Sequence, residues 1–144
     1  MMNKVAERLY ISDYNEARAM SQTNPLNIQA DLNCSMMSDG HAGFHDIAYC
    51  RTDFPDGPAI PEPLFWRGMA FMVKEYLSGK NLLVHCAAGV SRSVTMACAL
   101  MTYLGLAPNM DEALKQVKAN RPQAGPAPAV FASAKQYLAE EGKS

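Results

Sequence analysis

Apolar residues fall into short dense runs at four places along the chain. The runs are residues 8–11, 29–33, 46–51 and 81–85. Each is short and bounded by polar or turn-forming residues, so each predicts a β-strand. The last of them, N-L-L-V-H, is apolar almost throughout, which is typical of a parallel strand that is buried on both faces.

Helical spacing of apolar residues marks five further segments, which alternate with the strands. Helices are expected from the capping box at Asp13 to about residue 20, at 62–78, at 93–104, from Asn109 to Arg121-Pro122, and at 129–141. Residues 93–104 are apolar nearly all round, as a central buried helix would be. The alternation predicts an α/β fold: one compact domain over residues 1–144, with a central, mostly parallel, twisted sheet flanked by helices.

Composition narrows the classes of function. The chain has 144 residues with 49% hydrophobic content, which suits one domain with one buried core. Thirteen basic against fourteen acidic residues give a net charge of -1, so no overall field attracts nucleic acid or an anionic membrane. The longest largely apolar run, residues 94–107, falls short of the roughly 18 residues that span a bilayer. We expect a soluble monomer without a nucleic-acid or membrane partner.

Four cysteines, Cys34, Cys50, Cys86 and Cys98, are irregularly spaced and include no C-x-x-C pair. This spacing favours free thiols in a reducing compartment over a disulfide framework. The N-terminus lacks the apolar core of a signal peptide, so we expect a cytoplasmic protein. The sequence leaves open whether one of the other three cysteines can pair with Cys86.

Residues 84–93, V-H-C-A-A-G-V-S-R-S, join the predicted buried strand to the predicted central helix. A loop that enters a helix N-terminus at this edge of a sheet points several backbone N–H groups at one spot, and the helix dipole adds positive charge there. Ala87, Ala88 and Gly89 are small enough for the backbone to curl around a phosphate. Arg92 can donate two parallel hydrogen bonds to its oxygens.

The same positive surroundings act on Cys86. A helix N-terminus and a nearby cation favour the thiolate over the thiol, and the thiolate is the nucleophile. The residues therefore indicate a phosphate site that contains its own nucleophile. The alternative is an inert buried thiol with a surface arginine some residues away.

The sequence H-C-A-A-G-V-S-R-S resembles the H-C-x-x-G-x-x-R-[S/T] loop of cysteine-dependent protein tyrosine phosphatases, and specifically that of their dual-specificity branch. Other stretches are similar to the same branch: Leu9-Tyr10-Ile11, Asp31-Leu32-Asn33, Asp111-Glu112-Ala113, Asn120-Arg121-Pro122 and Phe131. The resemblance covers most of the chain and implies a fold like that of the protein tyrosine phosphatases.

The resemblance implies a two-step phosphatase mechanism that uses no metal or cofactor. Cys86 would attack phosphorus to form a cysteinyl phosphate, while Arg92 and the loop amides would bind the phosphate and stabilise the transition state. Ser93 would steady the departing thiolate, and His85 would orient the cysteine. The phosphate-binding residues would be Ala87, Ala88, Gly89, Val90, Ser91 and Arg92.

The general acid is expected in residues 53–63, D-F-P-D-G-P-A-I-P-E-P, where four prolines predict a stiffened loop. In the related branch the acid lies in a segment of the form D-x-P-x-[IV], which D-G-P-A-I from Asp56 matches. Asp56 is therefore our candidate and Asp53 the alternative. A third possibility is that Asp56-Gly57 only forms a turn.

Three other features have structural explanations. His41 and His45 have ligand-like spacing, but no further Cys or His lies nearby, so we interpret them as loop residues rather than a metal site. Asn33 could brace the phosphate loop or support a turn after its strand. The methionines on the predicted helices are expected in the core; they include Met69, Met72, Met96 and Met101.

The resemblance implies that the substrate is a phosphorylated protein. Relatives that act on lipids carry lysines inside the loop, whereas Ala87, Ala88 and Val90 are uncharged. No segment like the one that deepens the pocket of tyrosine-only relatives is recognisable, so phosphotyrosine, phosphoserine and phosphothreonine should all fit. The alternatives are a phosphoinositide or RNA-phosphate phosphatase of the same fold, and a module that binds phosphoproteins without turnover.

Overall fold

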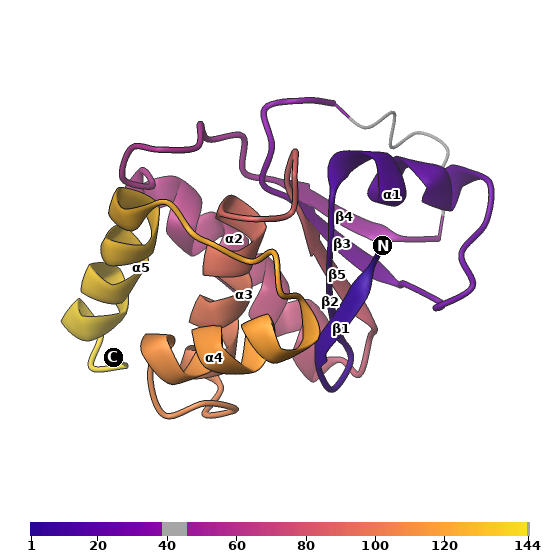
Figure 1. Ribbon diagram of the computed structural model, residues 1–144. Helices are drawn as coiled ribbons and strands as arrows, with labels where there is room; N and C mark the ends of the chain where they lie inside the picture. Colours follow the sequence, from indigo (N-terminus) through magenta and orange to yellow (C-terminus); the bar gives the residue numbers. More distant parts are fainter. Residues whose placement is uncertain (39–45, 144) are drawn as a thin grey trace.

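The computed structural model describes residues 1–38 and 46–143 and contains a five-stranded sheet with helices on both faces (Figure 1). In spatial order the strands are β1 (Asn3–Ala6), β2 (Leu9–Ser12), β5 (Leu82–His85), β3 (Ala30–Asn33) and β4 (Ala48–Arg51). β1 pairs with β2 in the antiparallel sense, and all other pairs are parallel. The predicted α/β fold with a mostly parallel sheet is confirmed.

The helices cover the two faces of the sheet unequally. The short helices α1 (Tyr14–Arg18) and η1 (Ala19–Ser21) lie on one face, and α2 (Glu62–Leu77), α3 (Arg92–Tyr103), α4 (Met110–Asn120) and α5 (Pro128–Glu140) lie on the other (Figure 1). In α3 every residue from Arg92 to Thr102 is buried, which confirms the predicted central helix. The helical methionines are in the core as expected: Met69, Met72, Met96 and Met101.

Local capping signals correctly predicted two helix starts. At α1 the Glu16 backbone N–H donates to Asp13 Oδ1 at 2.8 Å, and the Asp13 N–H donates to Glu16 Oε1 at 3.2 Å. At α4 the Glu112 N–H donates to Asn109 Oδ1 at 2.8 Å. These bonds satisfy N–H groups that the first turn of a helix leaves without backbone partners.

The strand β1 was not among the predicted elements. It is four residues long, and only Val5 of its N-K-V-A sequence is buried. Such a stretch carries too few apolar positions to indicate a strand by itself. β1 is a strand because the turn at Glu7-Arg8 folds it back onto β2, and Arg8 adopts a φ of 56° there.

The parallel register brings the carboxyl ends of four strands to one edge of the sheet. Ser12 of β2 and Asn33 of β3 both pair with His85, the last residue of β5. The segment that follows β5 therefore starts at the centre of this edge, where open α/β sheets place their ligands.

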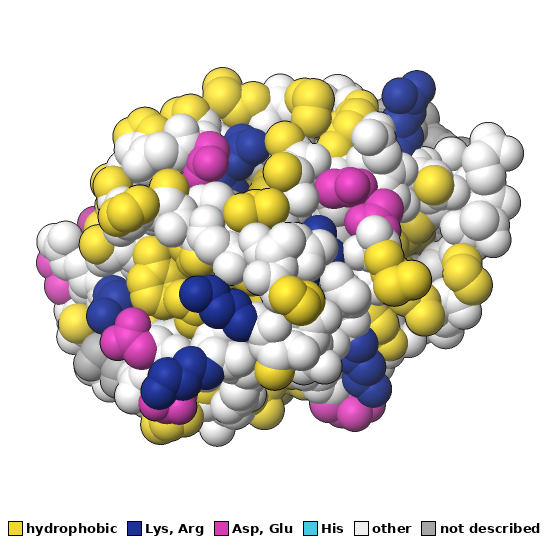
Figure 2. Space-filling view, in the orientation of Figure 1, with side chains coloured by type: hydrophobic (Ala, Val, Ile, Leu, Met, Phe, Trp, Pro, Cys, Tyr) yellow, Lys and Arg dark blue, Asp and Glu magenta, His cyan; other side chains and the backbone are white. Residues whose placement is uncertain are grey.

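On the face seen in Figure 2, no large region carries a single charge. Lys and Arg side chains are interspersed with Asp and Glu on the face seen in Figure 2. Within the described ranges, no helix combines the length and hydropathy needed to cross a bilayer.

Candidate active site

Residues 86–91 form the loop between β5 and α3, so Cys86 and Arg92 lie at its two ends. We call this segment the phosphate loop. Its position is the one expected from the sequence, at the carboxyl end of the central strand and at the N-terminus of the buried helix. The helix dipole therefore points its positive end at the loop.

The phosphate loop is held open by bonds from outside it. Three of its carbonyl oxygens accept: Ala87 O from the Tyr14 N–H at 3.0 Å, Gly89 O from Arg121 Nε at 2.7 Å, and Val90 O from the Gly125 N–H at 2.9 Å. In a planar trans peptide the N–H points away from the C=O. The N–H groups of Ala88, Val90 and Ser91 are therefore turned toward the inside of the loop, where they can bind an anion.

Gly89 is required by both conformation and space. Its φ is +68°, in the region that side-chain-bearing residues rarely adopt. A Cβ at this position would overlap Arg121 Nη2 and would lie 2.6 Å from the Ser12 carbonyl oxygen. The loop can pass this close to β2 only because residue 89 has no side chain.

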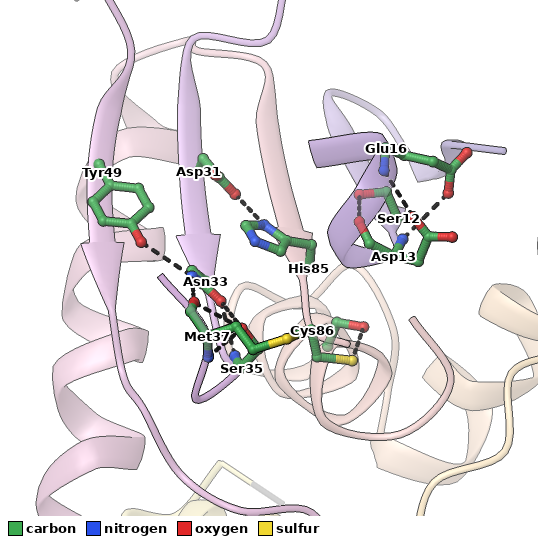
Figure 3. Close-up of polar contacts among 11 residues, drawn as sticks. Ser12, Asp13, Glu16, Asp31, Asn33, Ser35, Met37, Tyr49, His85 and Cys86 are labelled. Atoms are coloured by element: carbon green, nitrogen blue, oxygen red, sulfur yellow. Dashed lines mark hydrogen bonds and ion pairs between the residues drawn. The ribbon is translucent and has the colours of Figure 1, made fainter. Parts of the chain in front are cut away.

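Cys86 and Ser93 face each other across the start of α3. Cys86 Sγ lies 3.2 Å from Ser93 Oγ, and both residues are buried (Figure 3). In this geometry the hydroxyl can donate a hydrogen bond to a thiolate. The structure thus brings together two residues for which the family resemblance implied linked roles.

His85 is joined to a residue that was not singled out as a site residue. His85 Nδ1 lies 2.7 Å from Asp31 Oδ1, and neither side chain has any exposed surface (Figure 3). The pair lies between neighbouring strands, β5 and β3, and fixes the orientation of the imidazole ring. A charged residue inside the otherwise apolar A-D-L run of β3 was the signal in the sequence.

Arg92 and Asp56 link the proline-rich segment to the phosphate loop. Arg92 Nη1 donates to the Phe54 carbonyl oxygen at 3.0 Å, and Ser91 Oγ donates to Asp56 Oδ1 at 2.7 Å. Ser91 Oγ also accepts a bond from the Ala127 N–H at 2.8 Å. The carboxylate of Asp56 is therefore held beside the loop.

Asp53, the alternative acid, has a different environment. Its Oδ1 lies 3.5 Å from Arg51 Nη2, and about half of its side chain is exposed. Among the described contacts, the proline-rich segment reaches the phosphate loop through Phe54 and Asp56. The geometry thus favours Asp56 over Asp53 for a role at the loop.

Arg121 is a structural residue of the site that the sequence did not reveal. It is only 2% exposed, and besides Gly89 O it donates to Met1 O at 2.8 Å, Asn3 Oδ1 at 2.6 Å and Ile11 O at 3.4 Å. In the sequence it marked the end of a helix and belonged to a stretch, Asn120-Arg121-Pro122, that resembles the dual-specificity branch, but no contact with the phosphate loop was predicted. In the structure one guanidinium joins β1, β2 and the phosphate loop.

All four cysteines lie in the described residues, and all four are free thiols. Burial raises the pKa of Cys98 to about 12, and burial also raises the pKa of Cys34 and of Cys50. These three side chains are therefore protonated at neutral pH. Cys34 is next to the site, because its backbone N–H donates to the His85 carbonyl oxygen at 2.8 Å.

The two histidines with ligand-like spacing, His41 and His45, lie outside the residues that the structure describes. Among residues 1–38 and 46–143, no group of three His, Cys, Asp or Glu side chains could hold a metal ion.

Comparison with known proteins places this geometry in context. The family described as dual specificity phosphatase, catalytic domain, matches residues 9–138. Dual specificity protein phosphatase 15 of Mus musculus is 35% identical over 129 residues, covering 88% of this chain and 53% of that protein. Dual specificity protein phosphatase 22-B of Danio rerio is 36% identical over 129 residues, covering 87% of this chain and 67% of that protein.

Solved structures agree with the fold. A crystal structure of DUSP15 superposes with a TM-score of 0.85 at 27% identity and covers 99% of this chain and 90% of that chain. A crystal structure of human DUSP28 gives a TM-score of 0.81 at 26% identity. The chain spans about half the length of the mammalian phosphatase 15 sequences that it matches.

Proposed function

Since the chain belongs to the family of dual specificity phosphatase catalytic domains, we propose that it hydrolyses phosphate esters of tyrosine, serine and threonine side chains in proteins. The observation that carries the proposal is the phosphate loop, which has Cys86 and Arg92 at its ends and carbonyls held outward between them. Inward-turned N–H groups beside a sulfur nucleophile are suited to phosphoryl transfer.

In the first step the Cys86 thiolate attacks phosphorus, and a sulfur–phosphorus bond forms as the bond to the substrate oxygen breaks. Asp56 donates a proton to that leaving oxygen. Arg92 and the inward N–H groups of the loop bind the equatorial oxygens, whose charge must be stabilised in the transition state. The location of Asp56, 2.7 Å from Ser91 Oγ, keeps its carboxyl close to the loop.

In the second step Asp56 takes a proton from a water molecule, which attacks the phosphorus of the cysteinyl phosphate. The sulfur–phosphorus bond breaks, and inorganic phosphate leaves. Ser93 Oγ, 3.2 Å from Cys86 Sγ, donates a hydrogen bond to the departing thiolate. His85, fixed by Asp31, orients the backbone from which Cys86 projects.

The choice of a protein substrate rests on the side chains of the loop. Ala87, Ala88 and Val90 offer no cation for the additional phosphates of a phosphoinositide or an RNA 5′ end. The free thiols and the small net charge support a further proposal, that the protein works as a monomer in the cytoplasm.

A direct assay tests the proposed substrate class. The purified protein should release phosphate from phosphotyrosine and phosphothreonine peptides, and much less from phosphoinositide vesicles or from RNA with a 5′-triphosphate. Turnover restricted to the lipid or the RNA would overturn the protein-substrate proposal. Tight binding of phosphopeptides without release of phosphate would instead identify a binding module.

We expect Asp56→Asn to lower kcat by roughly 10²- to 10³-fold on substrates with poor leaving groups, because no acid protonates the leaving oxygen. On an aryl phosphate with a good leaving group the loss should be much smaller. Steady-state kinetics with two aryl phosphates of different leaving group measures both effects.

Asp53→Asn is the matched control for the acid. It makes the same chemical change three residues away, on a side chain that faces Arg51. Its leaving-group dependence should equal that of the wild type. If Asp53→Asn shows the leaving-group effect and Asp56→Asn does not, the two roles are exchanged.

A further inference from the structure

The turn formed by residues 35–38 lies beside the phosphate loop. One residue, Cys34, separates it from β3, and the Cys34 N–H donates to the carbonyl oxygen of His85, the residue before Cys86. Tyr14 connects the two segments from α1: its backbone N–H donates to Ala87 O at 3.0 Å, and its Oη donates to Ser38 O at 2.7 Å. The turn is therefore part of the surface that surrounds the candidate active site.

Polar side chains fix the backbone of this turn. Its carbonyl oxygens accept bonds from three elements: Met36 O from Arg51 Nη2 at 2.6 Å, Met37 O from Asn33 Nδ2 at 2.9 Å and Ser35 Oγ at 3.2 Å, and Ser38 O from Tyr14 Oη. Asn33 Oδ1 also accepts from the Ser35 N–H at 2.9 Å. Of the two roles expected for Asn33, the structure shows the turn (Figure 3).

The side chains of the turn are apolar and exposed. Met36 is 56% exposed and Met37 is 41% exposed, whereas the methionines of the helices are buried. With the carbonyls turned to protein donors, these two side chains are left at the surface. Figure 3 shows the Met37 side chain extending toward the end of β5, where Cys86 lies.

We propose that Met36 and Met37 bind an apolar side chain of the substrate that flanks the phosphorylated residue. The turn is fixed before binding, so the substrate does not have to order it. Methionine is flexible and polarisable, which allows contact with leucine, isoleucine, methionine or phenylalanine. The nearby cation, Arg51, is engaged by Met36 O and Asp53, so acidic flanking residues gain little there.

This inference rests on the proposed function for the phosphoresidue and adds the residues that flank it. It is tested by binding, so that the result does not depend on turnover. Phosphotyrosine peptides that differ only in flanking leucine, alanine or glutamate residues are titrated against the Cys86→Ser protein. We expect the leucine peptide to bind roughly tenfold more tightly than the alanine peptide, as partial burial of thioether and leucine surface would give.

The double substitution Met36→Ser with Met37→Ser, made in the Cys86→Ser protein, should abolish the preference for leucine and leave binding of the alanine peptide unchanged. Met36→Leu with Met37→Leu should retain the preference. Leu77→Ser is the matched control, because Leu77 is 69% exposed at the end of α2. That end lies at the amino edge of the sheet, where Arg8 Nη1 donates to Tyr76 O at 2.8 Å.

The outcomes separate the two proposals. Equal affinity for leucine and alanine peptides, or a preference that survives the double serine substitution, would overturn the recognition role of the turn. A methionine-dependent preference in a protein that never releases phosphate would support the recognition role and overturn the phosphatase. If the protein that retains Cys86 is active, the Met36→Ser and Met37→Ser substitutions made in it should leave hydrolysis of a small aryl phosphate unchanged, since that substrate has no flanking residues.

Discussion

The Cys86→Ser variant is expected to release no measurable phosphate from any ester that the wild type hydrolyses. A serine hydroxyl is not ionised in this pH range, and without a base beside it the oxygen is a poor nucleophile. We expect kcat to fall by on the order of 10⁴-fold or more, the scale of loss when a covalent nucleophile is removed. Serine differs from cysteine by one atom, so the loop, Ser93 and the fold should be retained.

Steady-state assays and a covalent test measure this effect. In rapidly acid-quenched wild type, mass spectrometry should find phosphate attached to the peptide that contains residue 86, and the serine variant should show none. Cys50→Ser is the matched control, because Cys50 is a half-buried free thiol on β4. Its activity should equal that of the wild type. Residual turnover of Cys86→Ser within tenfold of the wild type would show that the nucleophile is another group.

Gly89→Ala is expected to reduce kcat/KM by about 100-fold or more, because the new methyl group would force the phosphate loop away from Arg121 and β2. The movement of a flexible side chain cannot make room for the new Cβ, since one of the atoms it meets is the backbone oxygen of Ser12. The positive φ adds strain, and together we expect the free energy of unfolding to fall by roughly 2–4 kcal/mol.

Gly105→Ala separates the effect of backbone strain from the effect of steric overlap. Gly105 has a similar φ of +75°, but a Cβ there meets nothing within 4 Å. This variant should lose about 1 kcal/mol of stability from strain alone and keep full activity. Urea unfolding and steady-state kinetics of both variants make the comparison. A Gly89→Ala protein with wild-type kcat/KM would show that the loop does not need its close approach to β2.

Much of the fold followed from local patterns. The apolar run that became β5, the nearly uniform apolar surface of α3 and the caps at Asp13 and Asn109 each carry their signal within a few residues. β1 does not, because four residues with one buried side chain become a strand only through pairing with β2. The formation of β1 depends on pairing with β2, and the pattern of residues within β1 does not reveal that pairing.

The site likewise contains residues that a local pattern reveals and residues that only folding brings together. The roles proposed for Cys86, Gly89 and Arg92 could be inferred from their spacing, because all three lie within residues 86–92. The sequence offered both Asp53 and Asp56 in one stiff segment, and the bond from Ser91 to Asp56 exists only after that segment has folded against the loop. Asp31 and His85 are 54 positions apart and meet through strand pairing.

The phosphate loop is held by residues that are synthesised after it. Gly89 and Val90 of the phosphate loop are held by Arg121 and Gly125, and Ser91 is bonded to Ala127. On the ribosome, Cys86 and Arg92 are synthesised before these three partners. A nascent chain therefore contains Cys86 before the loop can be held in its final shape, and we expect that shape only when the segment after α4 has emerged and bonded back to the loop.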